Sequence, residues 1–102
     1  MKIRILTSAV SDLADGRRFY ERQGAGLGEY FLDSLFSDID SLALYGGIHR
    51  KLFGFHRLLS QRFPYAIYYA LDADGEAVVV YRVLDCRQDP DKTRAALQRG
   101  EA

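Results

Sequence analysis

The sequence predicts an α+β fold: two antiparallel helices packed on an antiparallel or mixed β-sheet, in the order β-α-α-β-β-β with a short final helix. Two runs of β-forming residues, Tyr65–Leu71 and Ala77–Leu84, flank a polar turn that contains glycine, as in a β-hairpin. The chain before them carries apolar side chains at helical spacing. Amphipathic helices need a surface to cover, so the hairpin is expected to form the centre of the fold.

The N-terminal elements follow from local patterns. Residues 2–6 alternate between polar and apolar side chains and predict a short strand. Thr7 or Ser8 can cap the helix that follows, because a hydroxyl accepts hydrogen bonds from the free N–H groups of a first turn. Gly16 lowers helix propensity by about 1 kcal/mol relative to alanine, so a bend is expected there. The glycine-rich residues 23–28 predict a tight turn between two helices.

A second helix is predicted from Leu27 to the glycine pair Gly46–Gly47. Its aromatic side chains are expected in the core: Tyr30, Phe31 and Phe36. A strand is predicted over His56–Gln61. Asp91 is expected to cap a last helix that runs through Leu97, with Gly100 after its end.

The strand that begins after Pro64 has two distinct faces, because successive side chains of a strand point to opposite sides. One face is expected under the helices: Tyr65, Ile67, Tyr69 and Leu71. The other face is expected to be open: Ala66, Tyr68 and Ala70.

The composition limits the classes of protein to which the chain can belong. The 102 residues fit one domain, residues 1–102, and the formal net charge of zero does not indicate nucleic-acid binding. A single cysteine and the lack of a long apolar run indicate a cytoplasmic protein outside the membrane. No cofactor or metal is expected. No Asp or Glu occurs between Asp40 and Asp72, and that gap holds cations and two histidines that could form a basic face: His49, Arg50, Lys51, His56, Arg57 and Arg62.

The order of elements, together with several short segments, resembles the RelE/ParE superfamily of toxins from type II toxin–antitoxin systems. The resemblance covers nearly the whole chain. The matching segments are Ser11-Asp12-Leu13, Phe19-Tyr20-Glu21, Gly26-Leu27-Gly28 with Phe31, Arg57-Leu58-Leu59, Arg62-Phe63-Pro64-Tyr65, Ile67-Tyr68-Tyr69, Val80 to Val83 and Arg87-Gln88-Asp89-Pro90.

The resemblance implies one of two activities. RelE-like members cleave mRNA on the ribosome with basic residues on the sheet, whereas several ParE-like members act on DNA gyrase. This chain has Ala66 where RelE-like ribonucleases place an arginine and Asp85 where many relatives carry histidine. Thr93 lies near the expected position of a C-terminal tyrosine. These departures favour a ParE-like toxin that inhibits its target by binding and is neutralised by a cognate antitoxin.

Two alternatives stay open: a ribosome-dependent, metal-independent mRNA endoribonuclease, and a non-toxic interaction protein with the toxin fold. Candidate catalytic residues of a nuclease are Arg57, Arg62, Arg82 and Arg87. Candidate target-binding residues are Arg50, Lys51, Arg57, Arg62 and Arg87. Candidate antitoxin-binding residues are Leu58, Leu59, Phe63 and Arg82. The resemblance further implies that operator DNA is contacted only through the antitoxin.

Overall fold

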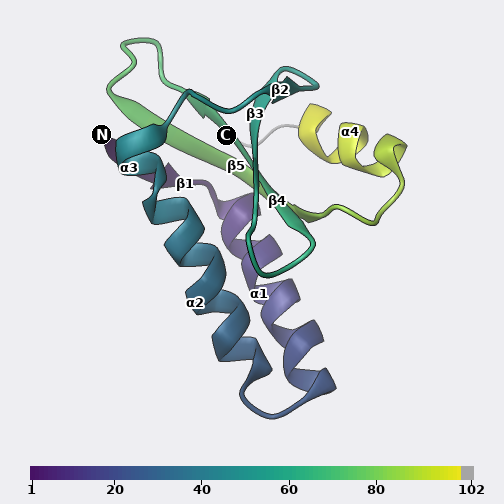
Figure 1. The fold of residues 1–102 in the computed structure, drawn as a ribbon. Coiled ribbons are helices and arrows are strands. Elements are labelled where there is room, and N and C mark those ends of the chain that lie inside the picture. Colours follow the sequence, from purple (N-terminus) through teal and green to yellow (C-terminus); the bar gives the residue numbers. More distant parts are fainter. Residues whose placement is uncertain (100–102) are drawn as a thin grey trace.

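A computed structural model describes residues 1–99 of the chain (Figure 1). Its elements in sequence order are β1 (Lys2–Ile5), α1 (Thr7–Gln23), α2 (Leu27–Asp40), α3 (Leu42–Tyr45), β2 (Lys51–Leu52), β3 (Phe55–Leu59), β4 (Tyr65–Leu71), β5 (Ala77–Asp85) and α4 (Pro90–Gln98). The α+β class and the order of the main elements agree with the prediction. Within residues 1–99, no helix has the length and apolar character needed to cross a membrane.

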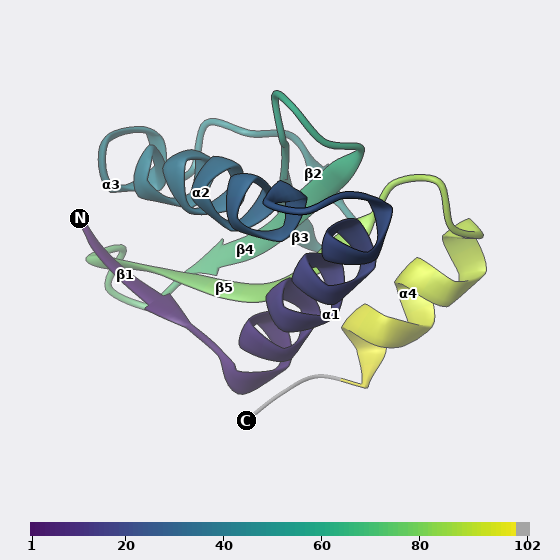
Figure 2. The ribbon, with the colours of Figure 1, turned by 90° about the horizontal axis from the view of Figure 1, so that it is seen from below.

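The five strands form one mixed sheet in the order β1-β5-β4-β3-β2. β1 runs parallel to β5, and the other neighbours are antiparallel. The predicted hairpin of β4 and β5 therefore occupies the centre of the sheet. Helices α1 and α2 run side by side, and α4 lies on the side of α1 away from α2 (Figures 1 and 2).

Helix α1 begins without the predicted side-chain cap. Leu6 occupies the N-cap position, and no side chain accepts a hydrogen bond there. Thr7 and Ser8 already belong to the helix. The hydroxyl of Ser8 instead donates to the carbonyl oxygen of Tyr81 in β5, at 2.8 Å. The prediction that Thr7 or Ser8 caps this helix was wrong, because Ser8 is used to join α1 to the sheet.

Gly16 serves helix packing. It is buried on the face of α1 that meets α2, and a Cβ atom added there would lie 2.5 Å from Cζ of Phe31. A side chain at this position would clash with a ring that is itself fully buried. Helix α1 continues through Gly16 to Gln23, so the glycine allows the two helices to approach each other closely.

The second predicted helix is divided in two at Ser41, where α2 gives way to the short α3. Phe31, Leu35 and Ile39 are spaced by four residues and are buried against the sheet. Tyr30 and Phe36 lie off this stripe and are 47% and 41% exposed, so the prediction that they belong to the core was wrong. A helix buries one face, and the aromatic residues are divided between two faces.

One face of β4 is buried as predicted: Tyr65, Ile67 and Tyr69 pack in the core under α1 and α2. Leu71, at the end of the strand, is 37% exposed. The opposite face is covered, contrary to the prediction of an open surface. Ala66 and Tyr68 of this face form a buried cluster with Leu84 of β5 and with two residues of α4, Ala96 and Leu97.

β5 does not keep a strict alternation. Tyr68 is opposite Arg82, and the next residue, Tyr69, is opposite Val80. Tyr81 is therefore an extra residue, a β-bulge. Because of this bulge, Val80 and Val83 both face the helices, and Arg82 is kept out of the apolar core.

One strand boundary and one helix cap also differ from the sequence prediction. The strand predicted at His56–Gln61 spans Phe55–Leu59. The side chain of Asp89, and not that of Asp91, caps α4 by accepting a hydrogen bond from the backbone N–H of Asp91. Gly100 lies outside the described residues.

Candidate functional site

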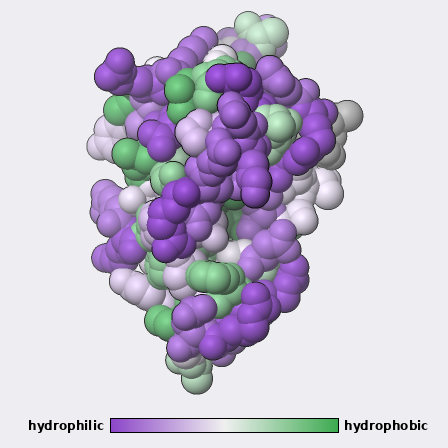
Figure 3. Space-filling model, turned by 90° about the vertical axis from the view of Figure 1, so that its right-hand side faces the viewer, coloured by the Kyte–Doolittle hydropathy of each residue, from purple (hydrophilic) through white to green (hydrophobic). Residues whose placement is uncertain are grey.

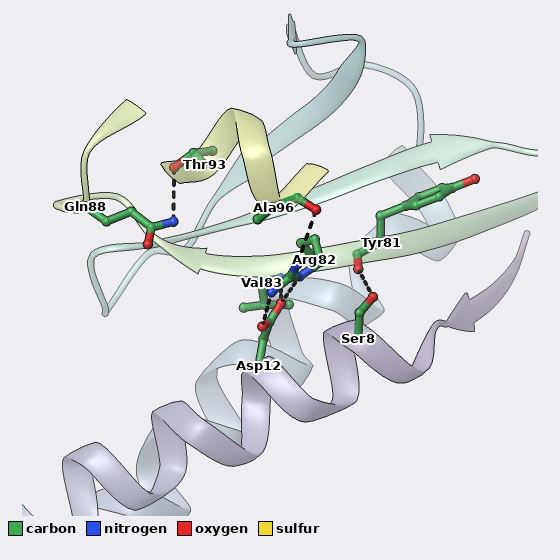
Figure 4. A network of polar contacts seen from close by, with 8 residues as sticks. All are labelled: Ser8, Asp12, Tyr81, Arg82, Val83, Gln88, Thr93 and Ala96. Carbon is green, nitrogen blue, oxygen red and sulfur yellow. Dashed lines mark hydrogen bonds and ion pairs between the residues drawn. The ribbon is translucent and has the colours of Figure 1, made fainter. Parts of the chain in front are cut away.

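Arg82 lies on the part of β5 that β1 does not pair with, and a residue of α1 binds it there. β1 pairs with β5 only as far as Val80. Beyond that point the Asp12 carboxylate accepts hydrogen bonds from Arg82 Nε (2.7 Å) and Nη2 (2.8 Å) and from the backbone N–H of Val83 (3.0 Å). Arg82 Nη1 also donates to the carbonyl oxygen of Ala96 in α4 (Figure 4). Arg82 therefore joins α1, β5 and α4.

Arg87 pairs with Asp85, two residues earlier. Its Nε and Nη2 atoms donate to the two carboxylate oxygens at 3.0 and 2.7 Å, and its backbone N–H donates to one of them. These hydrogen bonds hold the pKa of Asp85 below its ordinary value. The pair is thus charged on both sides at neutral pH, and the carboxylate offsets the positive charge of Arg87.

Arg57 has neutral partners. Its Nε donates to the hydroxyl of Tyr68 at 3.1 Å, and Nη2 lies 3.6 Å from Sγ of Cys86. Burial raises the pKa of the Cys86 thiol, so this sulfur is a thiol at neutral pH and a weak nucleophile. An open cavity of about 240 Å³ lies here, lined by Leu52, Phe53, Arg57, Tyr68, Cys86, Gln88, Pro90 and Thr93.

The remaining cations lie on the surface. Arg62 is exposed in the turn between β3 and β4, and Arg50 and Lys51 are exposed at the β2 edge of the sheet. The structure thus brings Arg50, Lys51 and Arg57 to one edge. Arg62 lies at the opposite end of β3 from Lys51, and Arg82 and Arg87 are each held by a carboxylate of their own.

The four candidate antitoxin contacts differ in accessibility. Leu58 and Phe63 are partly buried and pack against the main core. Arg82 is engaged by Asp12, and its side chain is 18% exposed. Leu59 is 53% exposed and is the accessible apolar residue of the four.

The two histidines lie around Tyr69. His49 Nδ1 is 2.5 Å from the Tyr69 hydroxyl, which also accepts a hydrogen bond from the backbone N–H of Gly47. The His56 ring stacks on the Tyr69 ring, with 5.0 Å between ring centres. Burial, followed by the proximity of His56, lowers the pKa of His49. His56 Nδ1 also lies 2.6 Å from the carbonyl oxygen of His49, so both rings help to fasten the segment before β2 to the sheet.

Sequence reasoning missed Asp12, the residue that holds Arg82. The Asp12–Arg82 pair joins positions 70 residues apart, and no local pattern links them. The one available signal was an acidic residue next to Leu13, within the stripe of α1 that packs on the sheet. The contact of Arg57 with Tyr68 could have been expected, because directly opposite residues of neighbouring strands lie side by side.

Two helices on a five-stranded mixed sheet, with basic side chains around the sheet, form the architecture of the RelE/ParE class of small toxins. A family model described as "ParE toxin of type II toxin-antitoxin system, parDE" matches residues 3–90. The chain therefore belongs to the ParE toxin family of type II toxin–antitoxin systems. The match ends where α4 begins.

A solved structure supports the fold independently. The chain is similar to one from the chromosomal ParDE toxin–antitoxin system of P. aeruginosa, with a TM-score of 0.65 and 17% sequence identity. The alignment covers 81% of this chain and 92% of that one. A comparison with curated protein sequences finds no match.

Proposed function

We propose that this protein is a ParE-like toxin that inhibits an essential target, with DNA gyrase as the first candidate, by binding to it. A cognate antitoxin neutralises it. The observation that carries the proposal is the family match, which spans residues 3–90. That match supports membership of a toxin–antitoxin pair, and the arrangement of the side chains favours binding over catalysis.

Cleavage of RNA without a metal needs a base for the 2′-hydroxyl and cations that stabilise the phosphate in the transition state. Two of the four candidate arginines donate to carboxylates, Arg82 to Asp12 and Arg87 to Asp85. Because the carboxylate offsets the positive charge of its arginine, a paired arginine stabilises a negatively charged phosphate less than a free one does. This arrangement supports a protein that acts by contact.

His56 does not complete a catalytic set with Arg57. His56 and Arg57 are consecutive in β3, so their side chains point to opposite faces of the sheet. His56 stacks on Tyr69 of the helix-covered face, whereas Arg57 contacts Tyr68 of the face covered by α4. A base and a cation on opposite faces cannot act on one phosphate.

Target contact is proposed for the cations of the sheet edge and turns, of which Arg57 is half-buried and the others are exposed: Arg50, Lys51, Arg57, Arg62 and Arg87. The side of the molecule that carries α4 is largely hydrophilic, with small separate hydrophobic areas (Figure 3). For the antitoxin, Leu58 and Phe63 contribute to the core, and Leu59 is the accessible contact. Exposed apolar residues of α1 and α2 are further candidates for antitoxin contact: Val10, Phe19, Leu27, Tyr30 and Phe36.

The proposal is tested with purified protein and purified gyrase. Inhibited supercoiling, with accumulation of cleaved DNA, is the expected result. The double variant Arg50→Glu, Lys51→Glu should require about tenfold more protein for the same inhibition, because it reverses charge at the contact. Cleavage of ribosome-bound mRNA without any effect on gyrase would contradict the proposal and support the ribonuclease alternative.

A further inference from the structure

The cavity between the sheet and the start of α4 has one cation and otherwise neutral walls. Its volume is about 240 Å³, and it is lined by Leu52, Phe53, Arg57, Tyr68, Cys86, Gln88, Pro90 and Thr93. No carboxylate of the described residues is among them. Tyr68 and Thr93 are only 3% and 6% exposed, so the inner end of the cavity is formed by buried side chains.

The Arg57 guanidinium faces this cavity. Its Nε donates to the Tyr68 hydroxyl at 3.1 Å, and its Nη2 lies 3.6 Å from Sγ of Cys86; both partners line the cavity. Within residues 1–99, Nη1 donates no hydrogen bond and Arg57 forms no ion pair. A guanidinium has five N–H donors in a planar fork that matches a carboxylate. Arg57 can therefore still bind an anion.

The apolar wall of the cavity includes a residue with an unusual backbone. Phe53 has a φ of 55° and the next residue, Gly54, a φ of 87°. A two-residue turn with positive φ at both positions favours Asn, Asp or Gly, and a bulky side chain there is strained. The Phe53 ring packs on the apolar cluster around Tyr68, and the Arg94 guanidinium lies 5.0 Å from the ring centre. The strained turn therefore fixes an aromatic wall beside Arg57.

The neutral polar groups of the cavity have hydrogen-bonding capacity left. The Tyr68 hydroxyl accepts from Arg57 and keeps its own proton for donation. Gln88 Nε2 donates to Thr93 Oγ1 at 3.1 Å (Figure 4), and Gln88 Oε1 accepts no hydrogen bond from the described residues. Apolar walls with a few convergent polar groups are typical of sites for small molecules.

Charge and size define the class of ligand. Arg57 is half-buried and is the one cation among the described residues that line the cavity. It can offset a single negative charge, and a second charge would be buried without a partner. A cavity of about 150 Å³ is large enough for benzene, so about 240 Å³ accommodates a ring of that size together with a carboxylate.

We propose that this cavity binds a small monocarboxylate that carries a flat apolar group, a ligand of about the size of benzoate. Its carboxylate pairs with Arg57 and accepts a hydrogen bond from the Tyr68 hydroxyl. Its apolar group lies against Phe53 and Leu52. This ligand is neither the target nor the antitoxin, so the inference goes beyond the proposed function.

The neighbouring cavity at the β2 edge suits such a ligand less well. It has a volume of about 340 Å³, and two exposed cations, Arg50 and Lys51, line it in addition to Arg57. Its one ring is that of His49, which is engaged by the Tyr69 hydroxyl. Several hydrated cations without a free aromatic wall attract anions in general and do not select an apolar group.

The experiment uses the purified full chain with benzoate as the probe and benzamide as its neutral analogue. Binding is followed by NMR titration of the labelled protein. The expected result is saturable shifts of the Thr93 amide, the Gln88 side-chain amide and the Arg57 Nε–H, with a millimolar dissociation constant, as for other ligands of this size. Benzamide should bind about tenfold more weakly, because it forms no ion pair with Arg57.

Variants of the cation test its role. Arg57→Gln should weaken benzoate binding about tenfold or more, because it removes the charged donor. Arg57→Lys keeps the charge without the planar fork and should retain part of the affinity. The matched control is Lys92→Gln, which removes an exposed cation of α4 that does not line the cavity. This control should bind benzoate like the unmodified protein.

A further variant tests the cavity itself and leaves Arg57 in place. Cys86 is exposed, so Cys86→Leu should keep the melting temperature of the unmodified protein. The larger side chain narrows the cavity and should abolish benzoate binding. Unchanged binding in a folded Cys86→Leu variant would contradict the assignment of the ligand to this cavity.

Other results would also overturn the proposal. These are the absence of saturable shifts at tens of millimolar benzoate, equal binding of benzamide, and equal losses in Arg57→Gln and Lys92→Gln. Shifts centred on the Leu59 amide would place the ligand at the β2 edge, and tighter binding of inorganic phosphate would indicate a general anion site. None of these measurements involves gyrase or toxicity, so this site and the proposed function can fail separately.

Discussion

Asp12 is the residue on which the junction of α1, β5 and α4 depends. Its carboxylate accepts from Arg82 and from the Val83 N–H, and its side chain is 10% exposed. Loss of this carboxylate would remove an anionic partner of a nearly buried guanidinium and the acceptor of a backbone N–H. The expected cost of Asp12→Ala is about 3 kcal/mol of unfolding free energy, measured by urea denaturation.

The Asp12 prediction has a control one helical turn away. Asp15 pairs with Arg18, but their side chains are 66% and 60% exposed, so Asp15→Ala should cost less than about 0.5 kcal/mol. The double variant Asp12→Ala, Arg82→Met should recover part of the loss, because it also removes the nearly buried positive charge that Asp12 balances. Equal effects of the two single variants would contradict this account of the junction.

Gly16 is required by the contact between α1 and α2. Alanine would improve helix propensity by about 1 kcal/mol, but its Cβ would lie 2.5 Å from the Phe31 ring. Overpacking of this kind costs about 1–3 kcal/mol, so Gly16→Ala should lower the urea midpoint. Ser11→Ala, at an exposed position of the same helix, should leave the midpoint unchanged or raise it. A stabilised Gly16→Ala variant would show that the helices can separate at little cost.

At the scale of elements, α4 covers the second face of the sheet. Leu97 is 3% exposed and packs with Tyr68 and Leu84. Leu97→Asp places a charge in that apolar cluster and should destabilise the protein by about 2–4 kcal/mol. The neighbouring exposed residue provides the control, since Gln98→Asp should change stability by less than about 0.5 kcal/mol. Differential scanning fluorimetry of both variants measures the contrast.

The segment between α3 and β2 is fastened to the sheet by the Tyr69 hydroxyl. This hydroxyl accepts from the Gly47 N–H and can then donate its own proton to His49 Nδ1, 2.5 Å away. Protonation of His49 removes that acceptor. This agrees with a His49 pKa that burial holds below its ordinary value of 6.5.

This tether predicts a pH dependence. A histidine with a depressed pKa in the folded state contributes stability above pH 6.5, and that contribution is lost as the pH falls through the folded-state value. Stability should therefore decrease as the pH falls below 6.5, the ordinary pKa of histidine. The variant His49→Gln should show a flatter profile by urea denaturation at each pH. Parallel profiles of the two proteins would exclude His49 as the origin.

At the scale of the molecule, the sequence predicted the elements better than their contacts. The β-branched and aromatic runs identified β4 and β5, and apolar periodicity identified α1 and α2, because these signals are local. The bulge at Tyr81 left no such signal. Strict alternation from Val78 and Val80 would have placed Arg82 in the core, and the extra residue avoids that.

In the candidate site, too, local sequence signals could be interpreted, whereas contacts between distant residues could not. The sequence indicated a basic face from the absence of acidic residues between Asp40 and Asp72, and Arg50, Lys51 and Arg57 do meet at one sheet edge. The pairing of Arg82 with Asp12 could not be predicted, because it depends on how α1 lies against β5 in space, whereas Asp85 is only two residues from Arg87. These pairings are what favour a binding protein over a ribonuclease.

The most direct test of a toxin that acts by binding is induced expression in cells that lack the antitoxin. Pulse labelling follows DNA, RNA and protein synthesis, and primer extension follows the integrity of mRNA. We predict that DNA synthesis stops first, with filamentation and intact mRNA. An early collapse of translation with cleaved mRNA would contradict the account, and unimpaired growth would contradict toxicity itself.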